Sequence, residues 1–175
     1  QKALTCFKAY DIRGEINVNI DENAAYRTGR AVAQHFEAGF VVVGFDARET
    51  SPSFADAVAL GICDAGSDAL TIGLAGTEEM YWAVTEFGAC AGIEVTASHN
   101  PINYNDMKIV KSGSQPLDDI NDFQVIKELV GSQNWDEPAR AGVAHDYAAK
   151  ARLKYTDRLL LLFGERFSHF SRILF

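Results

Sequence analysis

The sequence predicts an α/β fold in which a mainly parallel sheet has helices on both faces. Strand-like and helix-like segments alternate as far as Leu117, a pattern that indicates βαβ crossovers. Residues 40–46, FVVVGFD, form an apolar run of the kind expected in a strand buried on both faces. The chain has 175 residues and is 47% hydrophobic, which is enough to form the core of one domain.

A helix is predicted on each side of this strand. The first spans residues 21–39, has Asp21 as its candidate N-cap, and carries small or apolar residues at helical spacing: Ala25, Thr28, Val32 and Phe36. The second spans residues 52–66 and opens with Pro52, which is favoured in a first turn, while Gly66 is a typical stop. Its apolar face contains Phe54, Val58 and Ile62.

Three more strands and one helix complete the alternating region. The strands are predicted at residues 68–73, 91–98 and 107–111, and the helix at residues 78–88. Gly76, followed by Thr77 and two acidic residues, fits the start of this helix, because acids in the first turn complement the helix dipole.

Beyond Leu117 the alternation weakens. Helices are predicted at residues 118–131 and 145–163, with a connector between them. The last segment is rich in phenylalanine, and a terminus this apolar normally docks against another surface. We therefore predict one domain over residues 1–160 and an atypical C-terminal tail over residues 161–175.

Charge and cysteine content restrict the function. A formal net charge of −8 argues against nucleic acid or an anionic membrane as a partner, so an anionic ligand would need a local group of Arg or Lys. The three cysteines are widely separated, which fits reduced thiols in a cytoplasmic protein. No apolar run is long enough to span a membrane and no signal-peptide core is visible, so a cytoplasmic location is expected.

A turn of small polar residues follows the strand at residues 91–98. It contains Thr96, Ser98, His99 and Asn100 and lies where ligands bind in α/β sheets, beyond the carboxyl end of a strand. Ser98 could act as a nucleophile or phosphate carrier, but a plain polar turn with hydroxyls capping backbone groups explains the same residues. A hydrolase triad is disfavoured because the chain lacks the GxSxG elbow around this serine.

Two other polar turns have matching positions. In YDIRG, Tyr10 and Arg13 lead into a glycine, and the guanidinium suits phosphate, although an Asp–Arg surface pair would also explain the turn. In GFDARETS, which precedes a helix N-terminus, Asp46 and Arg48 could orient the serine turn, but pairing with each other is favoured. Three polar turns at strand ends predict one shared cleft.

Read together, these stretches resemble the first domain of the α-D-phosphohexomutases, most closely the bacterial phosphomannomutase branch. The motifs YDIRG, GFDARETS, GTEEMYWA and GIEVTASHNPINYNDMKIV stand in the order of that family. The resemblance is strong up to Leu117 and looser to about residue 160. It implies a three-layer α/β sandwich and an isomerase that moves phosphate between O6 and O1 of mannose or glucose.

The resemblance also implies residue roles. Ser98 would be carried as phosphoserine, Lys108 would act near the reacting oxygens as an acid, base or electrostatic aid, and Arg13 would steady the phosphoryl group. His99 would contact the substrate and the serine. The substrate-binding or supporting residues would be Tyr10, Asn100, Asp46 and Arg48. The partners implied are a phosphohexose substrate and a hexose bisphosphate activator, and Mg²⁺ would be bound through the phosphate of Ser98.

Two departures from the family pattern qualify these expectations. Asp106 stands where the family usually has Gly, and its carboxylate could pair with Lys108, alter the turn or repel phosphate. The metal, sugar and phosphate loops of the family's second to fourth domains are absent from these residues, so the chain alone is expected to be poorly active. A stand-alone, non-catalytic domain that binds a phosphosugar or a partner protein is the alternative, and self-association through an exposed domain interface is expected.

Overall fold

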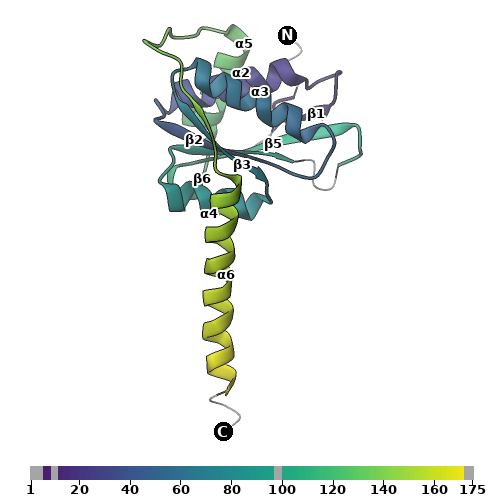
Figure 1. The fold of residues 1–175 in the computed structure, drawn as a ribbon. Coiled ribbons are helices and arrows are strands. Elements are labelled where there is room, and N and C mark those ends of the chain that lie inside the picture. The colour runs from purple at the N-terminus through teal and green to yellow at the C-terminus, as the bar shows by residue number, and fades with distance from the viewer. Residues whose placement is uncertain (1–5, 9–11, 97–99, 172–175) are drawn as a thin grey trace.

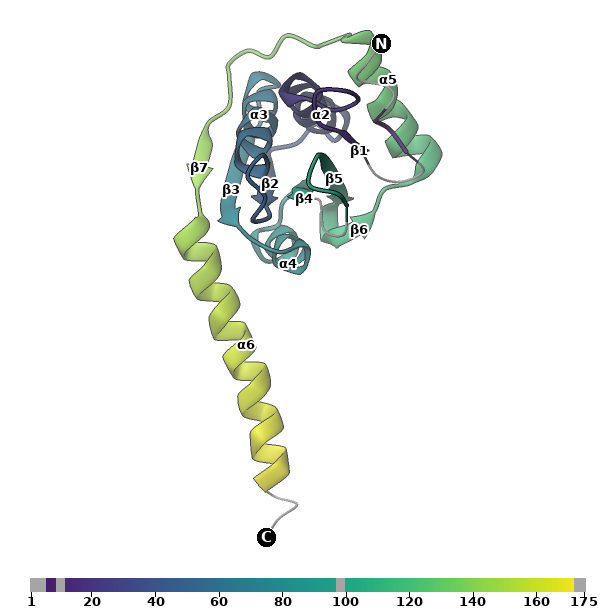
Figure 2. The same ribbon diagram turned by 90° about the vertical axis from the view of Figure 1, so that its right-hand side faces the viewer.

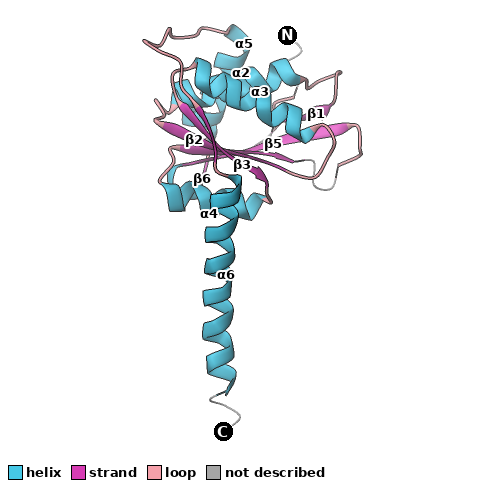
Figure 3. Ribbon diagram, viewed as in Figure 1, coloured by secondary structure: helices cyan, strands magenta, loops and turns pink. Residues whose placement is uncertain are grey.

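The computed structural model describes residues 6–8, 12–96 and 100–171, and side chains as far as Gly164 (Figure 1). Three predicted site residues, Tyr10, Ser98 and His99, lie outside this part of the chain. The described residues form one seven-stranded sheet with helices packed on both faces (Figures 1 and 3). The predicted α/β fold is therefore confirmed.

One side of the sheet is parallel. Its strands, each hydrogen-bonded to the next in parallel register, are β4 (Ala91–Thr96), β2 (Phe40–Phe45), β3 (Asp68–Leu74) and β7 (Ala144–Asp146). Helices separate β2, β3 and β4 along the chain, as parallel pairing requires a crossover between neighbouring strands.

The other side of the sheet is antiparallel. β5 (Tyr104–Lys111) pairs with β4, with β1 (Ile12–Glu15) and with the short β6 (Gln115–Pro116). The connection from β4 to β5 spans only residues 97–103, which is too short for a crossover, so the chain reverses and runs back beside β4. This places the predicted serine turn at the carboxyl end of β4 and the amino end of β5.

Helices cover the two faces unequally (Figure 2). α2 (Glu22–His35), α3 (Ser51–Asp64) and α5 (Gln124–Ser132) pack over the larger core cluster on one face. α4 (Thr77–Phe87) packs on the opposite face with a smaller apolar cluster that includes Val42, Ile72 and Met80.

The predicted helix signals act as expected. The Asp21 carboxylate accepts a hydrogen bond from the backbone N–H of Ala24 at 2.8 Å and so caps α2. Pro52 lies in the first turn of α3, and Gly66 follows that helix with a positive φ of 87°.

α2 and α3 approach each other through two glycines. A Cβ atom added at Gly61 would lie 2.0 Å from the carbonyl oxygen of Tyr26, and one at Gly29 would lie 2.2 Å from that of Val58. Only glycine allows the two backbones to come this close. The pair of helices that covers the larger core therefore depends on both positions.

A partly buried group of hydrogen bonds around Asp122 connects the turn before α5 to α2 and to the sheet. A π-helical turn, Asp119–Phe123, leads into α5, so the predicted helix at residues 118–131 is present with an altered first turn. In this turn Asp122 accepts from His35 of α2 and from Lys111 of β5, both at 2.9 Å. Burial alone would raise the pKa of Asp122, but these two hydrogen bonds and one from the backbone N–H of Asp118 lower it.

The C-terminal region differs from the sequence prediction at its start. His145 and Asp146, predicted to begin a helix, belong instead to β7, and α6 (Ala148–Ser171) begins after them. The strand exists because backbone groups at its two ends bond to β3, which no local pattern reveals. The first turns of α6 touch the domain through Ala151 and Tyr155, and the rest projects away from it (Figures 1 and 2).

The tail and the membrane-spanning potential of the helices complete the description of the fold. α6 runs through residue 160, and the division of the chain at that point stays a prediction. Among the described residues, no helix combines the length and the apolar character that crossing a bilayer needs.

Candidate functional site

The candidate site lies where β4 and β2 end and β5 begins. Thr96 is the last residue of β4 and directly precedes the segment that contains Ser98 and His99. The described neighbours of that segment can be placed, although the serine itself lies outside the described residues. Their arrangement follows from the strand register, because residues paired across a sheet point to the same face.

A first row of polar side chains crosses the sheet at this end. Arg13 of β1 is paired with Asp106 of β5, and Asp106 is paired with Thr96 of β4. The Thr96 hydroxyl donates to Asp46 Oδ2 at 3.1 Å, which extends the row to the residue that follows β2. Four chemically active side chains from four segments thus form one line beside the serine turn.

A second row runs parallel to the first, one step deeper into the sheet. Lys108 of β5 is paired with Glu94 of β4, and Glu94 is paired with Gly44 of β2. Since alternate residues of a strand share a face, Lys108 points to the same side as Asp106 and hence as Arg13. The two cations predicted to serve the reaction therefore share the face on which Thr96 lies.

This is the face covered by α4. A Cβ atom added at Gly92, two residues before Glu94 in β4, would meet Val84 and Met80 of that helix. The polar rows thus continue the smaller apolar cluster beneath α4. They lie toward the carboxyl ends of the parallel strands β2 and β4. Whether Arg13 and Lys108 converge on Ser98 stays a prediction.

Asp106 forms a different pair from the one expected. Its Oδ2 accepts from both Nε (3.1 Å) and Nη2 (2.9 Å) of Arg13, and it lies within β5 rather than in a turn. Of the possibilities raised for this carboxylate, pairing with Lys108 does not occur among the described residues. The register explains the difference, because Arg13 stands directly opposite Asp106, whereas Lys108 stands opposite Glu94.

Asp46 and Arg48 also act differently from the favoured prediction. The Arg48 guanidinium donates to the carbonyl oxygens of Asn100 and Pro101 and makes no side-chain pair with Asp46. Asp46 Oδ1 instead accepts from the backbone N–H of Arg48 at 3.0 Å and from the Ser51 hydroxyl at 2.5 Å. The favoured prediction, that the side chains of Asp46 and Arg48 pair with each other, is therefore wrong. Arg48 holds the C-terminal end of the serine turn, and Asp46 holds the end of β4.

Asn105 is a supporting residue that the sequence did not single out. It is fully buried, and its side-chain amide donates to the Thr50 hydroxyl at 3.2 Å while its carbonyl accepts from the N–H of Asp106 at 2.9 Å. It therefore connects the start of β5 to the start of α3. The sequence shows that Asn105 belongs to an Asn-rich turn motif, but it does not show that the side chain is buried.

Glu94 is a second residue that the sequence did not reveal. The side chain is fully buried, and neither carboxylate oxygen has a hydrogen-bond partner among the residues that the structure describes. Burial, followed by the charges of Asp46 and Glu79, raises its pKa to about 9. A Cβ atom at Gly44 would lie 2.4 Å from Glu94 Oε2, so glycine opposite this carboxyl leaves the space that it fills.

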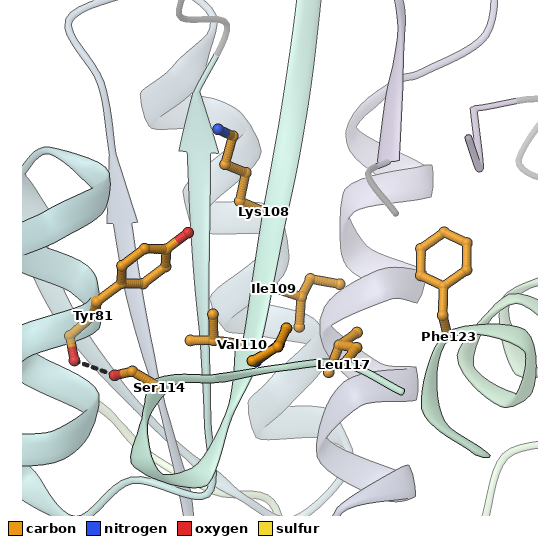
Figure 4. Close-up of a pocket in the computed structure, with 8 residues that line it drawn as sticks. Tyr81, Lys108, Ile109, Val110, Ser114, Leu117 and Phe123 are labelled. Carbon is orange, nitrogen blue, oxygen red and sulfur yellow. Dashed lines mark hydrogen bonds between the residues drawn. The ribbon is translucent and has the colours of Figure 1, made fainter. Parts of the chain in front are cut away.

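A cavity of about 380 Å³ adjoins the second row (Figure 4). Lys108, Tyr81 and Ser114 supply its polar lining, and Val110 and Leu117 are among its apolar walls. In Figure 4 the Lys108 ammonium and the Tyr81 hydroxyl both point away from the Ser114 turn. Lys108 is half-buried at the edge of this cavity, within reach of solvent.

The described residues of the site offer few groups that could bind a metal ion. Within residues 6–8, 12–96 and 100–171, no group of three or more His, Cys, Asp or Glu side chains is arranged to hold a metal ion. Two acidic residues of the site are engaged otherwise: Asp106 with Arg13, and Asp46 with hydroxyls and a backbone N–H. These residues do not fit a Mg²⁺ site of their own.

Comparison with known proteins identifies relatives of this arrangement. Residues 4–134 match the family model described as phosphoglucomutase/phosphomannomutase, alpha/beta/alpha domain I. A phosphomannomutase of Escherichia coli is 45% identical over 159 residues, which are 90% of this chain and 34% of that protein. A phosphomannomutase of Klebsiella pneumoniae is 49% identical over 141 residues, 79% of this chain and 90% of that protein.

Solved structures agree with the sequence comparison. A phosphoglucomutase/phosphomannomutase family protein from Burkholderia thailandensis superposes with a TM-score of 0.72 at 30% identity, covering 84% of this chain and 33% of that one. The chain thus spans about a third of the length of the E. coli protein (34%) and of this solved protein (33%).

Proposed function

Because the chain belongs to the phosphoglucomutase/phosphomannomutase family and corresponds to its domain I, we propose that it carries the phosphoserine of a phosphomannomutase at Ser98. The reaction interconverts mannose 6-phosphate and mannose 1-phosphate through a hexose bisphosphate. The observation that supports this most is that Arg13, Lys108 and Thr96 share one face of the sheet. They lie near the carboxyl end of β4, after which Ser98 follows in the chain.

The proposed bond changes are those of two phosphoryl transfers. A hydroxyl of the bound sugar phosphate attacks the phosphorus of phosphoserine 98, the bond from phosphorus to Ser98 Oγ breaks, and Oγ gains a proton as the hydroxyl loses one. The bisphosphate then turns around and returns its other phosphoryl group to Ser98 by the same changes in reverse. Such a transfer depends on positioning and on charge neutralisation.

Each cation has a separate role in this proposal. Lys108, half-buried beside a cavity, stabilises the oxygens that gain charge or exchanges a proton with them. Arg13 binds phosphoryl oxygens through its planar guanidinium. Tyr10 and His99 contact the substrate and the serine. Family members use Mg²⁺, which when bound neutralises charge on the phosphoryl oxygens, and the phosphate on Ser98 would be its ligand from this chain.

Two further residues, Arg48 and Asp46, hold the described residues that flank the serine turn. Arg48 holds the carbonyls of Asn100 and Pro101, and Asp46 bonds to Thr96. The described residues before and after Ser98, namely Thr96 and the pair Asn100 and Pro101, are therefore held, and these contacts support a role in pre-organising the carrier hydroxyl. Because the chain corresponds to domain I of the family, the step proposed for it is the phosphorylation of Ser98.

The test is the intact mass of the protein after incubation with a hexose 1,6-bisphosphate. We expect the native chain to gain one phosphate and Ser98→Ala to gain none. Ser53→Ala, which removes an exposed hydroxyl at the start of α3, is the matched control and should gain phosphate like the native chain. Equal labelling of the native chain and Ser98→Ala would contradict the carrier role.

The alternative function is binding of a phosphosugar without phosphoryl transfer. The observation that favours it is that the Arg13 guanidinium is already held by Asp106. In that case the bisphosphate would bind reversibly and the mass of the native chain would not change.

A further inference from the structure

Arg13 is the first residue of the first polar row, and one edge of its guanidinium is occupied. Nε and Nη2 both donate to a single oxygen, Asp106 Oδ2, at 3.1 and 2.9 Å. This pair of N–H groups is an edge through which arginine binds carboxylates and phosphates with two parallel hydrogen bonds. An anion that approaches this edge meets a carboxylate already in place.

The two partners differ in freedom to move. Asp106 is 2% exposed and belongs to the middle of the sheet, with β4 on one side of β5 and β1 on the other. The Arg13 side chain is 42% exposed and comes from the edge strand β1. The carboxylate is therefore enclosed by the sheet, whereas the guanidinium is the partner that a ligand from solvent can reach.

We propose that Asp106 is an internal competitor for the phosphate-binding edge of Arg13, and that it sets how strongly this domain binds phosphoryl groups. The proposal rests on the proposed function in assigning Arg13 to the phosphate. In the free domain Asp106 holds the guanidinium. A phosphoryl group gains Arg13 only by displacing or sharing that pair, and it also meets the negative charge of Asp106.

The experiment measures the affinity of the chain for inorganic phosphate by NMR titration of backbone amides. Asp106→Asn removes the charge with little change in shape, so we expect phosphate to bind about three- to thirtyfold more tightly. Asp106→Glu restores the charge and should return the affinity to near the native value. Asp56→Asn, on α3, is the control for the change in net charge and should leave the affinity unchanged.

A second set of variants tests whether Asp106 acts through Arg13. In an Arg13→Gln background, Asp106→Asn should give no more than a small gain, because the edge that it releases is gone. Unchanged or weaker binding by Asp106→Asn, with a native-like amide spectrum, would show that the carboxylate orients Arg13 for the ligand and would overturn the proposal. An equal gain with and without Arg13, or no phosphate binding in any variant, would also overturn it.

The same titration separates this proposal from the carrier function. In a Ser98→Ala background, phosphorylation is impossible, yet Asp106→Asn should still strengthen reversible phosphate binding. A gain in affinity together with no mass increase in the native chain would leave the competitor role standing and remove the phosphoserine. A mass increase in the native chain without a gain in affinity in Asp106→Asn would support the phosphoserine and overturn the competitor role.

Discussion

At the level of single residues, the unusual group is Glu94, a buried carboxyl beneath the candidate site that has no hydrogen-bond partner in the described part of the chain. Burial and the nearby acids raise its pKa to about 9, whereas in the unfolded chain it should titrate near its ordinary value of 4.5. Between these values the unfolded state has released the proton and the folded state still holds it. Stability from this group is therefore fully present below about pH 4.5 and is lost as the pH rises toward 9.

We predict that Glu94→Gln flattens this dependence. In the native chain the group should lower the free energy of unfolding by roughly 4 kcal/mol between pH 5 and pH 8, and the variant should lose that slope. Urea denaturation at several pH values measures it, with Glu78→Gln, an exposed residue of α4, as the matched charge control. Parallel profiles for the native chain and Glu94→Gln would contradict a protonated carboxyl at this position.

At the level of helices and strands, the contact between α2 and α3 is the most demanding. We predict that Gly61→Ala lowers the free energy of unfolding by about 1–3 kcal/mol, because the added methyl would collide with the Tyr26 carbonyl of α2. Denaturant unfolding measures the change. Gly164→Ala is the matched control, since it is also a helical position but has no atom within 4 Å of the added Cβ. Equal effects of the two substitutions would show that helix propensity, rather than close packing, governs Gly61.

At the level of the whole molecule, α6 projects from the domain and carries an apolar run, Leu159–Phe163, whose residues are 37–70% exposed. Apolar surface of this kind favours association. We expect sedimentation velocity to show concentration-dependent self-association that the double variant Leu160→Lys, Leu161→Lys reduces. Leu60→Lys, at an exposed position of α3, is the control. A clean monomer over a wide concentration range would show that this surface does not associate. Equal weakening of self-association by Leu60→Lys would place the contact elsewhere.

Local signals in the amino-acid sequence were sufficient for the class of fold and for most of its elements. The cap at Asp21, the first-turn Pro52 and the stop at Gly66 each depend on residues a few positions apart, so they could be recognised in the chain itself. The motifs around Arg13, Asp46 and Lys108 likewise identified the family.

Long-range strand pairing added what such signals do not contain. It formed β7 beside β3, gave Asp106 to Arg13 rather than Lys108, and enclosed Glu94 between neighbouring strands under α4. These outcomes depend on which distant residues stand opposite one another, and register is set by the packing of the complete sheet rather than by any short stretch of sequence.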